Sequence, residues 1–245
     1  KGLREKVIIA TKFGTDPSTG RSSIKGGGTK KYIIGAVEES LERLETDYID
    51  LYQMHFPDAE TPIEETLRAL EDLINSGKVR YIGASNFASW QVSESGWTSL
   101  TNELDQFISL QTRYSILTRD IEQEILPACE KHQVSLLPYF PLESGLLTGK
   151  VTRDKEPPKG SRLALWKGAF TSEEKFNIID KINDYGAEIG RNILEISLAW
   201  TAHRSQVGSV LVGATSPEQM IQNIDAISWD ISEKQIQAID EIVLG

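Results

Sequence analysis

Short apolar runs alternate with amphipathic segments along the whole of the 245-residue chain. The apolar runs have the length and the β-branched or aromatic content of buried strands, and the amphipathic segments carry apolar residues on one helical face. We expect six strands, at residues 7–10, 48–54, 81–84, 107–110, 134–140 and 209–212. We expect helices at about 29–44, 61–77, 88–104, 119–132, 172–189 and 194–204, and two more that begin after Ser216 and Ser232.

This alternation predicts a parallel sheet, either an open doubly wound sheet or a (β/α)8 barrel. Polar residues stand at the carboxyl end of nearly every expected strand, and such a ring suits a barrel mouth better than a single crevice. These residues are Lys12, His55, Ser85, Asn86, Gln111, Tyr139 and the stretch from Gly213 to Thr215. No GxGxxG sequence follows the first strand, which counts against a Rossmann domain. We therefore expect an α/β TIM barrel, one domain over residues 1–245, with six of its eight βα pairs in the chain.

His55 is a catalytic candidate because of its position. It ends the run from Tyr48 to Met54, and Phe56 and Pro57 follow it. The carboxyl ends of barrel strands form the active face, so a His in this place can act in catalysis. It can equally be a strand-end His that only hydrogen-bonds its neighbours, and both interpretations stay open.

Charge and composition exclude several classes of protein. A net charge of −10 without an offsetting basic stripe argues against a nucleic-acid binder. No run of about eighteen apolar residues is present, so no membrane span is expected. The three His residues are far apart and form no cluster at metal spacing, so no metal is expected. The first residues lack a signal peptide's apolar core, and the single Cys129 fits a reducing compartment, so we expect a cytoplasmic protein.

Six motifs, in order, resemble those of the aldo-keto reductases over essentially the whole chain. They are VIIATKFG, LxRLxxDYIDLYQMHFPD, GKVRYIGASNF, QTRYS, LPYFPLESGLLTGK with GSR behind it, and VGATSPEQ followed by Asn223. Within the family, the sequence is similar to the branch that contains bacterial reductases and the β subunits of potassium channels. The resemblance implies a barrel that binds NADP(H) across its mouth and transfers a hydride to a small-molecule carbonyl substrate, an aldehyde or a ketone.

The resemblance also implies roles for individual residues. Lys12 and His55 match two members of the family's catalytic set, in which a tyrosine is the acid, the lysine lowers its pKa and the histidine orients the carbonyl. Ser85, Asn86 and Gln111 match residues that hold the nicotinamide carboxamide, and Tyr139 matches the ring that stacks on the nicotinamide. Further cofactor-binding positions implied by the motifs are Pro141, Leu142, Gly145, Leu147, Lys150, Arg162, Gly213, Thr215, Gln219, Gln222 and Asn223.

The last motif departs from the family at the adenosine phosphate. Some relatives have Lys and Arg where this chain has Gly213 and Gln219, and Gln222 stands where an acid is common. The preference for NADP over NAD is therefore open. Lys150 and Arg162, in the long polar segment from residue 145 to 171, can supply the missing charge or can belong to an ordinary charged loop.

The start of the chain differs most from the pattern of the family. In the family two βα pairs precede the equivalent of the first strand here, and the second carries the catalytic tyrosine and its aspartate partner in a D-T-A-x-x-Y-G motif, which this sequence lacks. At about 30 residues per pair the full barrel would have near 300 residues. We expect the chain to be incomplete at its start, and unable in this form to reduce carbonyls at a useful rate.

Three rival interpretations remain. One is a barrel aldolase that uses Lys12 as a Schiff-base nucleophile. Another is a non-catalytic module that binds NADPH and regulates a partner, as channel β subunits do; those relatives tend to lose the strand-end histidine, whereas this chain keeps His55. The third is a family fragment without activity. The physiological substrate and the oligomeric state do not follow from the sequence.

Overall fold

The computed structural model describes residues 2–15, 24–153, 157, 163–165 and 171–245. The chain divides into two compact units, the first formed by residues 1–112 and 122–136 and the second by 113–121 and 137–245. Each is described by itself.

The strands are parallel, as their alternation with helices predicts. They are β1 (Ala10–Phe13), β2 (Ile49–Met54), β3 (Val79–Ser85), β4 (Ser109–Arg113) and β5 (Ser135–Tyr139). They follow one another in the sheet in the order β1-β2-β3-β4-β5, with parallel pairing from β1 to β4. β2 is buried along almost its whole length, which is typical of a parallel strand covered on both faces. The fold is therefore α/β with a five-stranded parallel sheet.

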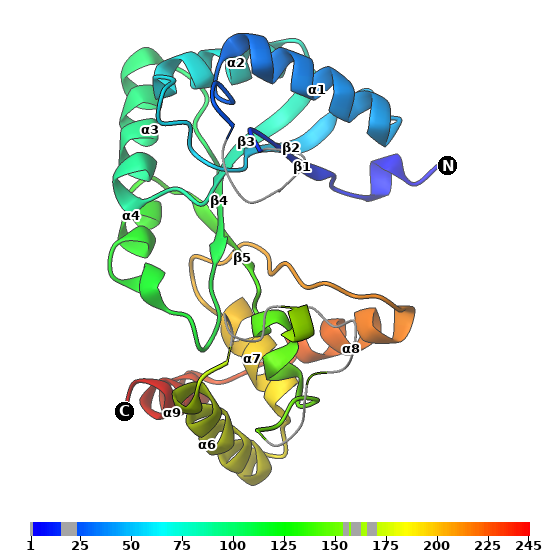
Figure 1. Cartoon of the computed structure of the whole chain (residues 1–245), viewed down its shortest axis with the longest axis vertical. Helices are drawn as coiled ribbons and strands as arrows, with labels where there is room; N and C mark the ends of the chain where they lie inside the picture. Colours follow the sequence, from blue (N-terminus) through cyan, green and yellow to red (C-terminus); the bar gives the residue numbers. More distant parts are fainter. Residues whose placement is uncertain (1, 16–23, 154–156, 158–162, 166–170) are drawn as a thin grey trace. The chain divides into compact units, whose positions relative to one another are not determined.

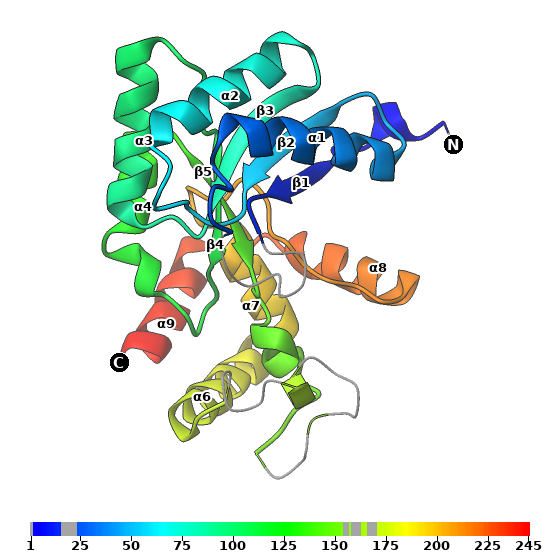
Figure 2. The same ribbon diagram turned by 45° about the horizontal axis from the view of Figure 1, so that its top comes forward.

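Four helices accompany the strands of the first unit. They are α1 (Lys30–Leu44), α2 (Ile63–Asn75), α3 (Ser89–Asn102) and α4 (Ile125–Lys131). Successive helices pack on each other, and Figures 1 and 2 show α1 and α2 as an outer layer beside the arrows of β1, β2 and β3. In α2, the apolar residues repeat at helical spacing and bury Leu67, Leu70 and Leu73, which holds this layer to its neighbours.

Four longer helices make up most of the second unit. They are α6 (Glu173–Ile189), α7 (Ile193–Ala202), α8 (Pro217–Ile227) and α9 (Glu233–Leu244). α7 is the core element, since nearly all its side chains are buried and it packs against α6 and α8. Short 3-10 helices complete the described elements: η1 (Arg4–Lys6), η2 (Asp120–Glu122) and η3 (Glu143–Thr148).

Two strands differ from their predicted positions. β1 begins at Ala10 rather than at Val7, and Val7 and Ile8 are exposed. The cause lies in β2: the Ile9 N–H donates to the Asp50 carboxylate (3.0 Å), and Phe13 stacks on Tyr52 with ring centroids 4.7 Å apart. These contacts set the register, so Lys12 lies within the strand and not beyond its end. In β4 the same shift, to Ser109–Arg113, puts Gln111 in mid-strand, and Ser85 is the last residue of β3.

The prediction of a sixth strand at residues 209–212 is wrong. Residues 209–212 form no strand, although the Leu211 N–H donates to the Pro138 carbonyl (3.0 Å). A strand needs a series of such bonds on at least one side, and apolar content alone does not supply it. The expected count of six βα pairs is therefore not confirmed, and no pairing of β5 with β1 closes the sheet among the described residues.

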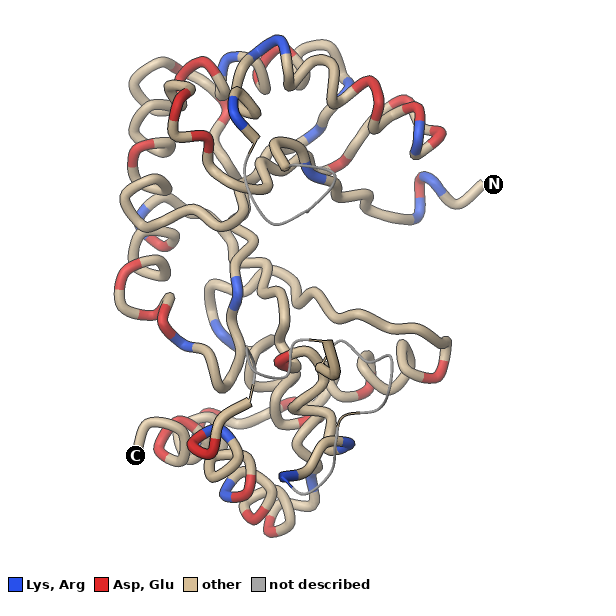
Figure 3. The backbone as a smooth tube through the Cα atoms, in the orientation of Figure 1, with Lys and Arg blue, Asp and Glu red and all other residues tan. Residues whose placement is uncertain are grey.

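Charged residues are spread over the helices. Figure 3 shows Asp and Glu distributed along them, with Lys and Arg in between. Within the described ranges, no helix is both long and apolar enough to cross a membrane, and no group of three or more metal-ligating side chains is found.

Candidate active site

Lys12 and His55 lie at the carboxyl ends of two neighbouring strands in the first unit. Lys12 is paired with Gln53 across β1 and β2, and the His55 N–H donates to the Phe13 carbonyl (2.9 Å), which extends that ladder by one residue. Both side chains are half-buried. Among the described residues, the Lys12 ammonium has neither a hydrogen-bonding nor an ion-pair partner.

The electrostatics of this pair favour one protonation state of His55. Burial lowers the pKa of Lys12. Burial, and then the positive charge of Lys12, lower the pKa of His55 to about 4. At neutral pH the imidazole is therefore uncharged and has one N–H to donate. Its ring stacks on Phe56, with centroids 4.8 Å apart.

Asn86 hydrogen-bonds to residues of, or next to, three neighbouring strands: β2, β3 and β4. Its side-chain amide donates to the His55 carbonyl (2.9 Å) and to the Ser85 hydroxyl (3.1 Å), and its backbone N–H donates to the Gln111 carbonyl (3.0 Å). Its φ of 59° lies in the left-handed region. Non-glycine residues adopt this conformation at a cost that the surroundings must offset, and such residues cluster at functional sites.

A buried amide pair lies one step further into the sheet. Gln53, 1% exposed, donates to the Gln111 side-chain oxygen (3.3 Å), and the Gln53 side-chain oxygen has no partner among the described residues. An unsatisfied buried acceptor costs about 1–3 kcal/mol, so it calls for an explanation such as a ligand. Gln53 was not predicted as a site residue; a glutamine between the apolar or aromatic residues Tyr52 and Met54 is the signal that could have revealed it.

These groups fit a nicotinamide carboxamide, which offers one acceptor oxygen and two N–H donors. The Ser85 hydroxyl and the Gln111 side-chain amide are buried donors, and the unpaired Gln53 oxygen is a buried acceptor.

In the second unit, Tyr139 ends β5. Its carbonyl accepts the Tyr114 N–H (3.4 Å), and its ring meets Phe140 edge-on at 5.3 Å. Burial raises the pKa of Tyr139, so its hydroxyl stays protonated at neutral pH. Of the predicted residues that follow, Pro141 and Leu142 precede η3, and Gly145 and Leu147 lie within it.

The last predicted group gathers at the start of α8. The Ser216 hydroxyl caps the helix by accepting the Gln219 N–H (3.3 Å). The Gln219 side-chain oxygen accepts from the Thr215 N–H (2.8 Å) and hydroxyl (3.0 Å), so Gln219 does not form a reciprocal capping box with Ser216. Asn223 is buried, whereas Gly213 and Gln222 are exposed. Lys150 is exposed, and Arg162 lies outside the described residues.

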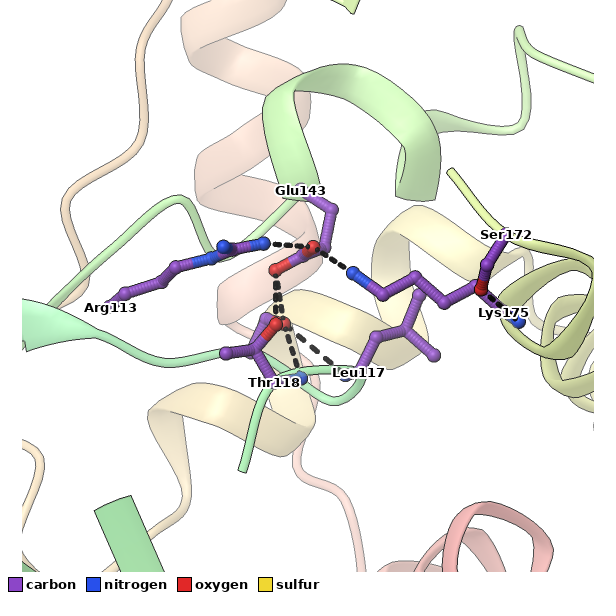
Figure 4. Close-up of polar contacts among 7 residues, drawn as sticks. Arg113, Leu117, Thr118, Glu143, Ser172 and Lys175 are labelled. Atoms are coloured by element: carbon purple, nitrogen blue, oxygen red, sulfur yellow. Dashed lines mark hydrogen bonds and ion pairs between the residues drawn. The ribbon is translucent and has the colours of Figure 1, made fainter. Parts of the chain in front are cut away.

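One charged residue of the second unit was missed. Glu143 lies between Leu142 and Gly145 in the motif LPYFPLESGLLTGK, and its side chain is fully buried. Figure 4 shows it between Arg113 and Lys175, with Thr118 on its other oxygen. The available signal was a carboxylate inside a run of apolar and small residues.

Comparison with known proteins identifies the family of the chain. The sequence profile of the Aldo/keto reductase family matches residues 1–244. The uncharacterized oxidoreductase YrpG of Bacillus subtilis (strain 168) is 33% identical over 245 residues, which cover 99% of this chain and 73% of that protein. The NADH-specific methylglyoxal reductase of Escherichia coli (strain K12) is 35% identical over 253 residues, 98% of this chain and 75% of that protein. A probable voltage-gated potassium channel subunit beta of Oryza sativa subsp. japonica is 33% identical over 232 residues, 91% of this chain and 69% of that protein.

The family match extends over nearly every residue, and the strand-end residues that carried the resemblance in the first unit lie together in the fold. Proteins of the aldo/keto reductase family are oxidoreductases that generally use a nicotinamide cofactor. The chain belongs to the aldo/keto reductase family.

Proposed function

We propose that this protein reduces small aldehydes or ketones to alcohols with NADPH, as a single (β/α)8 barrel domain in the cytoplasm. The observation that carries the proposal is the Lys12–His55 pair: a cation without a partner among the described residues beside an uncharged imidazole, at neighbouring strand ends. The bound cofactor would supply the hydride, and the protein has to place the carbonyl and stabilise the oxygen on which charge develops.

His55 and Lys12 suit that task. The neutral His55 donates an N–H to the carbonyl oxygen and so orients it, without a competing charge of its own. The half-buried Lys12 favours negative charge on that oxygen, because the surroundings screen its field less than bulk water would. The resemblance implies a tyrosine in a D-T-A-x-x-Y-G motif as the proton donor, and the sequence lacks that motif, so proton donation is assigned to no residue of the chain.

The cofactor is held by two groups of residues in this proposal. Ser85, Gln111 and Gln53 bind the carboxamide through the donors and the acceptor described above. In the second unit, taken by itself, Tyr139 stacks on the nicotinamide ring as the resemblance implies, and the turn at Leu142, Gly145 and Leu147 is a further part of the cofactor site. The adenosine end lies at Thr215, Gln219, Gln222 and Asn223, beside the capped start of α8, where backbone N–H groups favour an anion.

NADPH preference is assigned to Lys150 and Arg162. One relative is named as NADH-specific, so the preference needs a direct test. Replacing both residues by Ala should raise the Kd of NADPH roughly 10- to 100-fold, the value of a charge-assisted phosphate contact, and change the Kd of NADH little. Titrations with the two cofactors measure this, and an equal loss for both would contradict the assignment.

A screen of aldehydes and ketones, followed through NADPH absorbance, tests the reaction itself. Oxidation of NADPH that depends on the carbonyl supports a reductase. NADPH binding without turnover on any carbonyl would point to a regulatory role instead, and borohydride trapping of a carbonyl substrate on Lys12 would point to an aldolase.

A further inference from the structure

Glu143 is a fully buried carboxylate in the second unit that the proposed reaction does not use. Burial by itself would raise its pKa, but hydrogen bonds and charges from Lys175 and Arg113 outweigh burial and hold the pKa below its usual value. The residue is therefore a buried anion at neutral pH. Such a group is costly unless it is paired and fully hydrogen-bonded, so its partners matter.

Both carboxylate oxygens are fully engaged. One accepts from Arg113 Nη2 (2.7 Å) and Lys175 Nζ (2.8 Å), and the other accepts from the hydroxyls of Ser115 (2.8 Å) and Thr118 (2.9 Å). The Ser115 hydroxyl in turn accepts the N–H groups of Leu117 (3.2 Å) and Thr118 (3.0 Å). Figure 4 shows these contacts from three segments: the last residue of β4 with the chain that follows it, the turn that holds Glu143, and the first turn of α6.

The turn that Glu143 anchors has an unusual backbone. Glu143, Ser144 and Gly145 have φ values of 47°, 58° and 107°, and Phe140 has 55°. The first two and Phe140 are not glycine, so each is held in a conformation that L-residues rarely adopt. Such backbones persist only when the surrounding structure over-determines them, and they cluster at ligand clamps. Here the four hydrogen bonds to the Glu143 carboxylate hold the turn in this conformation.

We infer that Glu143, with Arg113 and Lys175 as its counter-ions, is a positioning residue that holds the turn from Phe140 to Leu147 in the conformation that binds the cofactor. The inference rests on the proposed function, which places the cofactor at Leu142, Gly145 and Leu147. Glu143 has no exposed surface and so acts through the backbone on either side of it, not by touching the ligand.

Glu143→Gln is the sharpest variant. It keeps the shape of the side chain but replaces one acceptor oxygen with an N–H₂ group, which faces donors that need an acceptor. Asp240→Asn is the matched control in the same unit, since Asp240 accepts from Arg119 Nη1 (2.8 Å), Arg204 Nη2 (2.6 Å) and Trp200 Nε1 (2.8 Å). Both changes remove one carboxylate charge from between two cations, and Asp240 lies in α9, outside the turn.

The experiment measures three quantities for the wild-type chain and both variants: Kd for NADPH and NADH by titration, kcat at saturating cofactor, and the thermal midpoint of the cofactor-free protein. For Glu143→Gln we expect both Kd values to rise roughly 10- to 100-fold, the loss that one charge-assisted hydrogen bond gives, with kcat changed less than about twofold. We expect the thermal midpoint to fall in both variants. For Asp240→Asn we expect both Kd values to remain unchanged. If Glu143→Gln lowers the midpoint but leaves Kd within about twofold of the wild type, Glu143 is structural only and the inference is overturned.

Two further outcomes are informative. If Glu143→Gln does not fold, Lys175→Met removes one counter-ion and keeps the carboxylate; a Kd raised about threefold or more supports the inference, and an unchanged Kd overturns it. If the wild-type chain itself binds neither cofactor, the proposed function fails in the first measurement. That result is distinct from a wild type that binds and a Glu143 variant that binds equally well, which overturns only the role of Glu143.

Discussion

The two ends of the first unit's strands hold charged groups in opposite ways. At the amino end, the Asp50 carboxylate pairs with Arg4 (2.8 Å) and Arg80 (2.9 Å) and accepts the Ile9 N–H. The same two guanidinium groups flank the Tyr48 ring at 3.7 Å and 4.0 Å from its centroid. Every one of these charges has a partner.

At the carboxyl end the corresponding groups are left incomplete. The Lys12 ammonium and the Gln53 side-chain oxygen have no partner among the described residues, and His55 is held uncharged. Charges that have partners fix the position of the elements that carry them. Buried polar groups without partners raise the free energy of the ligand-free protein, and a ligand that supplies the missing hydrogen bonds removes this cost. The comparison indicates that the charges at the amino end stabilise the fold, whereas the groups at the carboxyl end are the ones to which the proposed function assigns cofactor and substrate.

The largest effect should come from His55→Ala. General acid–base and orienting groups contribute about 10²–10⁴-fold to rate, so kcat/KM should fall by about that factor. The free energy of unfolding should change little, and the Kd of NADPH should stay nearly constant, because the side chain is only half-buried. Steady-state kinetics on a carbonyl that the protein reduces measures this, and an unaltered rate would make His55 a structural residue.

Asp50→Asn should act at the other end of the same strand in the reverse manner. Asp50 is largely buried but Arg4 and Arg80 are partly exposed, so water compensates part of the charge that its loss leaves, and the free energy of unfolding should fall by about 1–2 kcal/mol. Chemical denaturation measures the loss, and kcat/KM should remain within about twofold of the wild type. If Asp50→Asn lost activity without losing stability, the assignment of stability to the amino ends and activity to the carboxyl ends of the strands would be contradicted.

The smallest effect is a pH dependence of stability that comes from His55. Its pKa falls from the ordinary value of 6.5 to about 4 on folding, so between these values the unfolded chain binds more protons than the folded one. Stability should therefore be fully present above pH 6.5 and decline as the pH falls from 6.5 towards 4. Denaturation curves of the wild type and His55→Gln across this range should diverge, with the variant less dependent on pH. Parallel curves would contradict the assignment.

Much of this arrangement could be predicted from the sequence, and the exceptions have physical causes. β2 was predicted almost to the residue because it is buried on both faces and its residues, apart from Asp50 and Gln53, are apolar or aromatic. β1 was displaced because its register is set by Asp50 and Tyr52, which are distant in sequence. The segment at 209–212 has strand composition but lacks pairing partners along its length, and composition carries no information about partners.

Site residues show the same division. Lys12, His55, Ser85, Asn86 and Gln111 were found because strand ends and motifs mark them, and the fold brings them together within the first unit. Gln53 and Glu143 were missed because a polar residue in an apolar run marks a position without showing which groups the fold places around it once it is buried. The roles given to all of these residues remain proposals that the experiments above test.

Asn86 shows how much can be asked of one position. It needs a residue that tolerates the left-handed backbone, a side chain that donates to two oxygens, and a peptide N–H for Gln111. Glycine meets the first requirement and the third but has no side chain, aspartate has no amide donors, and glutamine places the amide one carbon further away. In a library of random substitutions, Asn86 should therefore be a position at which almost every replacement weakens the hydrogen bonds at the carboxyl end of β3.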